Sequence, residues 1–110
     1  MNVRVSFNTQ HFALNTGFMI VGTLRVRLLL REARSLKDKR QVVQSIKDRL
    51  RNAFDVSVAE VGEQDNRRVA VLGFALVGAE AYPVRTTLEK VVEALRGHPV
   101  AELLDHEIEV

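Results

Sequence analysis

Cysteine and tryptophan are absent from this 110-residue chain, and aromatic residues make up only 5% of it. Without cysteine, disulfide bonds, thiolate nucleophiles and cysteine-based zinc or iron–sulfur sites are excluded. The low aromatic content argues against recognition of nucleic-acid bases, which requires several stacking side chains. No apolar run reaches the roughly 18 residues that a membrane-spanning helix requires, and no basic segment followed by an apolar one indicates a signal peptide. These absences predict a cytoplasmic protein without a membrane partner.

The chain does contain enough apolar residues for one packed core, together with an uneven distribution of charge. Hydrophobic residues make up 46% of the 110 residues, which favours a single globular domain. The net charge of +2 results from an uneven distribution. Residues 31–51 hold eight Lys or Arg and three Asp or Glu, whereas residues 52–110 hold five Lys or Arg and eleven Asp or Glu. This asymmetry indicates either a binding face or the pairing of opposite charges within the molecule or between subunits.

Hydrophobic periodicity predicts six elements of secondary structure. Their order is strand, helix, strand, strand, helix, strand, over residues 20–30, 36–54, 55–61, 68–77, 83–96 and 103–110. This is the order of the ferredoxin-like, split βαβ fold. We therefore expect an α+β domain whose four-stranded antiparallel sheet has the order 4-1-3-2 and carries both helices on one face.

Residues 1–18 differ in composition from the rest, since they hold three of the five phenylalanines. Met19 opens the first predicted strand, so we interpret residues 1–18 as an extension or an artefact of the assigned start, and residues 19–110 as the domain. The extension is expected to be weakly ordered or docked at the periphery. The alternative is an additional strand, because the segment VRVSF alternates.

The stretch ARSLKDKR, residues 33–40, places four cations where the first helix begins. Ser35 is the expected N-cap, with Asp38 three residues later as in a weak capping box. A helix N-terminus carries partial positive charge, so each exposed cation there costs about 0.3–1 kcal/mol. A bound anion would remove this cost, and the free N–H groups of a helix start favour phosphate.

More basic residues follow on the same helix stripe. The predicted anion- or RNA-binding residues are Arg34, Lys37, Lys39, Arg40, Lys47 and Arg51. The alternative is an ordinary solvated helix face, which we favour for Lys47 and Arg51. Lys39 projects toward the middle of the apolar stripe, so we expect it to snorkel from the edge of the core. Its second interpretation is a lysine held firmly over the sheet end to receive a carboxylate or phosphate.

The strand over residues 68–77 is apolar on both faces. One face carries Val69, Val71, Ala75 and Val77, and helices can cover only one of the two. An uncovered apolar face is larger than monomers usually tolerate, which favours a homodimer through the open sheet face, with partial cover by residues 1–18 as the alternative. The predicted oligomer interface consists of Ala70, Leu72, Phe74 and Leu76.

The remaining polar residues favour structural roles over catalysis. Arg25 and Arg27 share a face of the first strand and are expected to pair with Glu107 and Glu109 of the last. The acidic residues and histidines do not have the spacing of metal ligands, so no metal or cofactor is expected. No nucleophile–base pair or glycine-rich phosphate loop is present. Enzymatic activity is therefore not expected, although the fold also hosts acyl-phosphate hydrolases.

Three segments resemble a known family: ARSLKDKR (33–40), FDVSVAEVGEQD (54–65) and LGFALV (72–77). They are similar to the small bacterial YlxP-like family of unknown function, and the resemblance runs from Met19 to Val110. It implies a ferredoxin-like fold and genes beside those of translation factors and ribosome-maturation proteins, but no catalytic residues. Relatives have an aromatic residue soon after the position of Asp65, where this chain has NRR (66–68).

Together these features predict a non-enzymatic binding module. It would contact RNA or a ribosomal component, such as ribosomal RNA, through the basic helix start during translation or ribosome maturation. Phosphate contacts rather than base readout would supply the affinity, and nothing favours DNA. The alternative is a protein-interaction or homo-oligomeric assembly module that uses the apolar open sheet face and does not bind nucleic acid.

Overall fold

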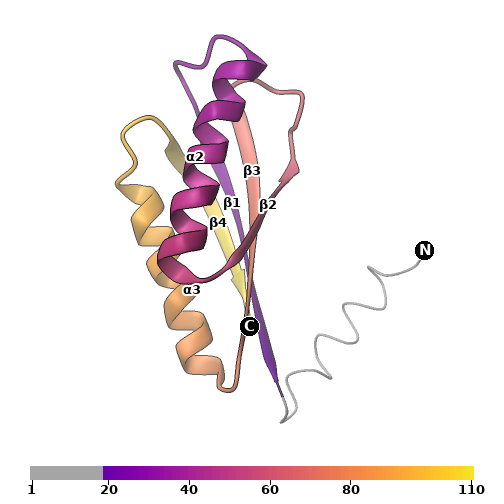
Figure 1. Ribbon diagram of the computed structural model, residues 1–110, viewed down its shortest axis with the longest axis vertical. Helices are drawn as coiled ribbons and strands as arrows, with labels where there is room; N and C mark the ends of the chain where they lie inside the picture. The colour runs from indigo at the N-terminus through magenta and orange to yellow at the C-terminus, as the bar shows by residue number, and fades with distance from the viewer. Residues whose placement is uncertain (1–18) are drawn as a thin grey trace, which may run out of the picture.

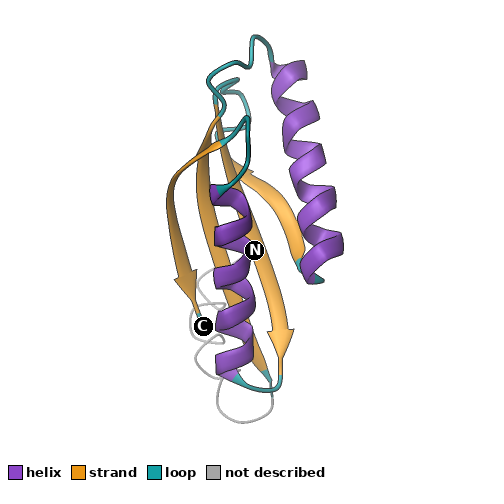
Figure 2. Ribbon diagram, turned by 90° about the vertical axis from the view of Figure 1, so that its left-hand side faces the viewer, coloured by secondary structure: helices purple, strands orange, loops and turns teal. Residues whose placement is uncertain are grey.

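A computed structural model describes residues 19–110. The elements are β1 (Ile20–Leu29), α2 (Leu36–Phe54), β2 (Ser57–Gly62), β3 (Val69–Gly78), α3 (Ala81–Arg96) and β4 (Glu102–Glu109). The strands form one sheet in the order β2-β3-β1-β4, with every neighbouring pair antiparallel. Both helices lie over the same face (Figures 1 and 2). The predicted ferredoxin-like fold and strand order are confirmed, whereas the predictions for residues 1–18 lie outside the described residues.

The core lies between the sheet and the two helices. Alternate residues of β1 and β3 point toward the helices and are almost completely buried. In α2 the inward residues recur at helical spacing, as Val43, Ile46 and Leu50. In α3 they are Val84, Leu88, Val91, Val92 and Leu95. Removal of this apolar surface from water is the main stabilising contribution to the fold. No helix within residues 19–110 is long and apolar enough to cross a membrane.

The predicted oligomer interface on β3 is wrong. Ala70, Leu72 and Phe74 are between 0 and 2% exposed and belong to the core, and Leu76 packs against it. Residues directly opposite each other in an antiparallel pair share a face. The partners of these β3 residues are Leu28, Val26, Leu24 and Gly22 of β1. The arginines of β1 occupy its other face, so the helices cover the side of β3 that had been predicted to be open.

Helix α3 packs closely against the start of β1 and the end of β3. A Cβ atom at Gly22 would collide with Val84 Cγ1, and one at Gly78 would lie 2.7 Å from Val84 Cγ2. Glycine is therefore required at Gly22 to let the helix approach the sheet. The opposite end of the sheet, where β1 ends and β3 begins, carries the start of α2 and the β2–β3 turn (Figure 1).

Candidate anion-binding site

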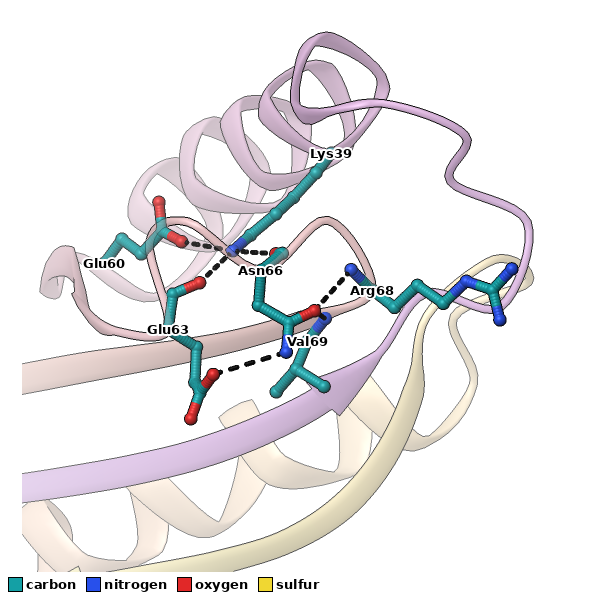
Figure 3. A network of polar contacts seen from close by, with 6 residues as sticks. All are labelled: Lys39, Glu60, Glu63, Asn66, Arg68 and Val69. Atoms are coloured by element: carbon teal, nitrogen blue, oxygen red, sulfur yellow. Dashed lines mark hydrogen bonds and ion pairs between the residues drawn. The ribbon is translucent and has the colours of Figure 1, made fainter.

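The β2–β3 turn has a defined backbone path that Asn66 fixes. Asn66 N–H donates to the Glu63 carbonyl at 3.0 Å. Asn66 Oδ1 accepts from the backbone N–H groups of Arg68 at 2.9 Å and Val69 at 3.2 Å, as Figure 3 shows. Glu63 has φ 56°, a left-handed conformation that a non-glycine residue adopts only where its surroundings hold it. The turn is therefore organised by Asn66.

Lys39 is only 1% exposed, and its ammonium contacts this turn from α2. Nζ donates to the backbone carbonyls of Glu63 at 2.6 Å and Asn66 at 2.7 Å. It also lies 2.9 Å from Glu60 Oε2 in an ion pair. The ammonium therefore forms two hydrogen bonds and one ion pair, all within the chain. The predicted snorkelling of Lys39 and its predicted role in binding an external anion are both wrong, because the turn covers Nζ and its hydrogen bonds are used internally.

Glu60 completes this buried contact from β2. Its side chain is 19% exposed, and Oε2 is itself buried with the Lys39 ammonium as its one partner among residues 19–110. A buried charge is tolerated only when it is paired and hydrogen-bonded. The contact therefore joins α2, β2 and the β2–β3 turn at one point (Figure 3). This is the second interpretation of Lys39, with a carboxylate of the chain itself in place of an external one.

The start of α2 carries the other three cations of the predicted cluster. Ser35 is the N-cap, as predicted, and its Oγ accepts from Asp38 N–H at 3.1 Å. Asp38 Oδ2 accepts from the backbone N–H of Arg34 at 2.9 Å. Arg34, Lys37 and Arg40 are exposed, and none of them forms an ion pair within the described part of the chain.

The other two predicted residues lie farther along α2. Arg51 Nη1 pairs with Asp48 Oδ1 at 3.2 Å, and Gln44 Nε2 donates to the same oxygen at 2.9 Å. At 1.5 Å per residue, Arg51 is about 16 Å along the helix from Arg40. Lys47 is half-buried on the same stretch. The structure therefore does not bring Lys47 and Arg51 to the helix start.

Three arginines outside the predicted set lie with Arg34 just before the helix start instead. A hollow of about 480 Å³ is lined by Arg31, Glu32, Ala33, Arg34, Arg67 and Arg68. Leu30 N–H donates to the Arg68 carbonyl at 2.6 Å and joins the two loops. Arg31 Nη2 pairs with Glu102 Oε1 at 2.8 Å, whereas Arg67 and Arg68 form no ion pair with residues 19–110. The sequence signal was the NRR segment, which had been noted only as a missing aromatic residue.

The strand arginines are engaged on the open sheet face. Arg25 Nη2 lies 3.6 Å from Glu107 Oε1, which confirms one expected cross-strand pair. Arg27 pairs with Asp105 at 2.8 Å instead of with a glutamate, next to an irregularity in the β1–β4 ladder. The hydrogen bond from Arg27 lowers the pKa of Asp105, and the same bond raises the pKa of Arg27.

The open face also has a hollow, whose lining includes the charged residues Arg25, Glu107 and Glu109. Small residues of β1, β2 and β3 line a depression of about 440 Å³, together with the exposed Val61. These small residues are Thr23, Ser57, Ala59, Gly73 and Ala75. No group of three or more His, Asp or Glu within residues 19–110 has the geometry to hold a metal ion.

Comparison with known proteins reveals one family. Residues 21–108 match a family described as "Protein of unknown function (DUF503)". The chain is also 30% identical over 83 residues to a protein of Bacillus subtilis (strain 168), the "Uncharacterized protein YlxP". That alignment covers 76% of this chain and 90% of the Bacillus protein. The matched region contains Lys39, Glu60 and the whole arginine-lined hollow.

Proposed function

This chain belongs to the DUF503 family of proteins of unknown function, and we propose that it is a non-enzymatic, cytoplasmic module that binds RNA through phosphate contacts. The ligand would be ribosomal RNA or another ribosomal component, bound during translation or ribosome maturation. The contact surface is the end of the domain where α2 begins and β2 turns into β3. We call this surface the basic end and define it by Arg34, Lys37, Arg40, Arg67 and Arg68.

The observation that carries the proposal is the lack of internal partners at the basic end. All five side chains belong to exposed residues, and none pairs with a carboxylate of residues 19–110. By contrast, the arginines of β1 are paired. Arginine and lysine bind phosphate oxygens well, and arginine can do so through two parallel hydrogen bonds. A group of exposed cations that forms no ion pair within residues 19–110 is therefore suited to a phosphate backbone.

Base readout is not supported at this end of the molecule. Phe74 is buried in the core, and the exposed Tyr82 lies at the start of α3, at the other end of the sheet. Among residues 19–110, no aromatic side chain lines the arginine hollow. Contacts to phosphates fix position without reading sequence, so we expect weak dependence on RNA sequence and strong dependence on salt.

The test is a titration of a ribosomal RNA fragment with the full chain, followed by fluorescence anisotropy between about 50 and 200 mM salt. K37A/R40A and R67A/R68A are each expected to reduce the salt slope by about 1–2 and to weaken binding at least severalfold. R85A/K90A is the matched control, because both residues are exposed on α3 and neither forms an ion pair with residues 19–110. No binding at low salt, or equal losses in the control, would overturn the proposal.

The open sheet face supports a second candidate, self-association through the depression and its exposed valines. Val61 and Val77 are 56% and 60% exposed, and the residues between them are small. A second copy would remove this surface from water. Sedimentation velocity over a range of concentrations tests the idea with V61D, and with V100D as the control at an exposed loop valine. A monomer at all concentrations, or equal behaviour of the two variants, would exclude this face as an interface.

A further inference from the structure

We propose that the four-arginine hollow is a phosphate-binding pocket and that buried Lys39 is the positioning residue that assembles it. This inference deepens the proposed RNA-binding function and rests on it for the identity of the larger ligand. The pocket would receive one phosphate group, either from the RNA backbone, from an RNA end or as a free anion. Lys39 itself would not contact that phosphate, because its ammonium is enclosed by its own three acceptors.

The pocket has two walls that come from distant parts of the sequence. Arg31 and Arg34 stand on the loop between β1 and α2, and Arg67 and Arg68 stand on the β2–β3 turn. Four guanidinium groups face one carboxylate, that of Glu32. Arg31 is partly neutralised by Glu102, with Nη2 and Nε at 2.8 and 3.1 Å from Oε1. The other three guanidinium groups keep their charge and their donors for a ligand.

The first wall is fixed by backbone contacts. Ala33 N–H donates to the Leu30 carbonyl at 3.3 Å, and Arg34 N–H donates to Asp38 Oδ2 at 2.9 Å. The bond from Leu30 N–H to the Arg68 carbonyl, at 2.6 Å, ties this wall to the second one. The backbones that carry Arg34 and Arg68 are therefore held close together, while their side chains remain exposed.

The second wall depends on Lys39. Its ammonium donates to the carbonyls of Glu63 and Asn66, and the Asn66 side chain then accepts from the N–H groups of Arg68 and Val69. Figure 3 shows Arg68 leaving the turn directly after this network and extending past the loop before α2. A chain of hydrogen bonds thus runs from the buried ammonium to the backbone that carries the two arginines.

The chemistry of lysine suits this position better than that of arginine. A compact ammonium can direct its three donors to a carboxylate and two carbonyls that converge on one point, whereas a guanidinium is planar and longer. Arginines crowded on two loops repel each other, so a firm attachment is needed to keep them facing one another without a ligand. A bound phosphate would offset this repulsion and stabilise the folded protein by mass action.

The experiment combines RNA binding with arginine Nε–H NMR spectra during titration with inorganic phosphate. The key variant is K39M/E60Q, which removes both buried charges and leaves no unpaired one; circular dichroism confirms that it is folded. It should lower RNA affinity and the salt slope as much as R67A/R68A does, and the combination of the two pairs should cause little further loss. K37A/R40A should instead be additive with K39M/E60Q. Inorganic phosphate should shift the resonances of Arg34, Arg67 and Arg68 in the unaltered chain.

The outcomes separate the inference from the proposed function. RNA binding that R67A/R68A leaves unchanged would overturn the pocket and leave the function intact. Phosphate shifts at the three arginines without RNA binding would support the pocket and overturn the function. A loss of RNA affinity in R67A/R68A but none in folded K39M/E60Q would overturn the positioning role of Lys39.

Tighter binding of a 5′-phosphorylated RNA than of its 5′-hydroxyl form assigns the pocket to an RNA end, and equal binding assigns it to the backbone.

Discussion

The Lys39 ammonium lies 2.9 Å from Glu60 Oε2, with both atoms enclosed between α2 and the sheet. This ion pair joins the helix start to the strand that leads into the β2–β3 turn. Its partners are two backbone carbonyls of the turn, so the pair sets the shape of a surface that neither side chain reaches.

Breaking the Lys39–Glu60 pair on one side should be strongly destabilising. K39M leaves the Glu60 carboxylate buried without a counter-charge, and we expect a loss of about 3–5 kcal/mol in the free energy of unfolding. K39M/E60Q should lose less than K39M, because no buried charge remains. Urea denaturation measures both. R51A is the control for an exposed ion pair, which should change stability by less than about 1 kcal/mol; a similar loss in R51A and K39M would contradict the buried geometry.

A substitution on the covered face of β3 should lower the free energy of unfolding, whereas one on the open face should leave it almost unchanged. L72A removes a fully buried side chain and should cost about 2–5 kcal/mol. V77A, at an exposed position on the other face, should change the free energy of unfolding by no more than about 0.5 kcal/mol. Chemical denaturation compares the two. A larger loss in V77A than in L72A would contradict the assignment of the covered and open faces.

Gly22 should not tolerate a methyl group. G22A places a Cβ against Val84 of α3, and displacement of that helix should cost about 1–3 kcal/mol. G97A is the matched control, since a Cβ there would meet nothing within 4 Å and the residue has φ −90°. Thermal unfolding should show a lower Tm for G22A and a Tm close to that of the unaltered chain for G97A.

His98 should titrate below its ordinary value of 6.5. Partial burial lowers its pKa, and the charge of Arg49 lowers it further; Nδ1 also accepts from Val100 N–H at 3.2 Å. The unfolded chain therefore binds the proton more readily, so the stabilising contribution is complete above about pH 6.5 and is lost as the pH falls from there toward the folded pKa. NMR titration of the imidazole in the unaltered chain and in R49A measures the shift. R49A should raise the pKa, and an unchanged value would exclude a contribution from Arg49.

Asp105 should titrate below its ordinary value of 3.8 because of the hydrogen bond from Arg27. A lowered carboxyl pKa means that the contribution to stability is present above the ordinary value and is lost as the pH falls through the folded one. R27A should return the pKa of Asp105 toward 3.8, whereas R85A, on α3, should not change it. Carboxyl NMR titration measures these values, and equal effects of the two variants would contradict the specific pairing.

Local sequence determined the elements of this protein. The alternation of β1, the apolar stripes of both helices and the N-cap at Ser35 are properties of neighbouring residues, so they could be recognised without a structure. Their order, together with the family resemblance, specified the fold, because few topologies accommodate strand, helix, strand, strand, helix, strand. The cations at the start of α2 were also visible as an electrostatic anomaly.

The tertiary structure decided what those cations do. Lys39 sits on the apolar stripe in the sequence, but whether its ammonium reaches water depends on the β2–β3 turn, which lies 24 residues or more farther along the chain. Arg67 and Arg68 join Arg34 only because β3 pairs with β1 in one register. The same register decides which face of β3 the helices cover. Periodicity describes contacts between residues a few positions apart, whereas register and burial arise from packing between distant segments, and for this reason only the folded chain shows them.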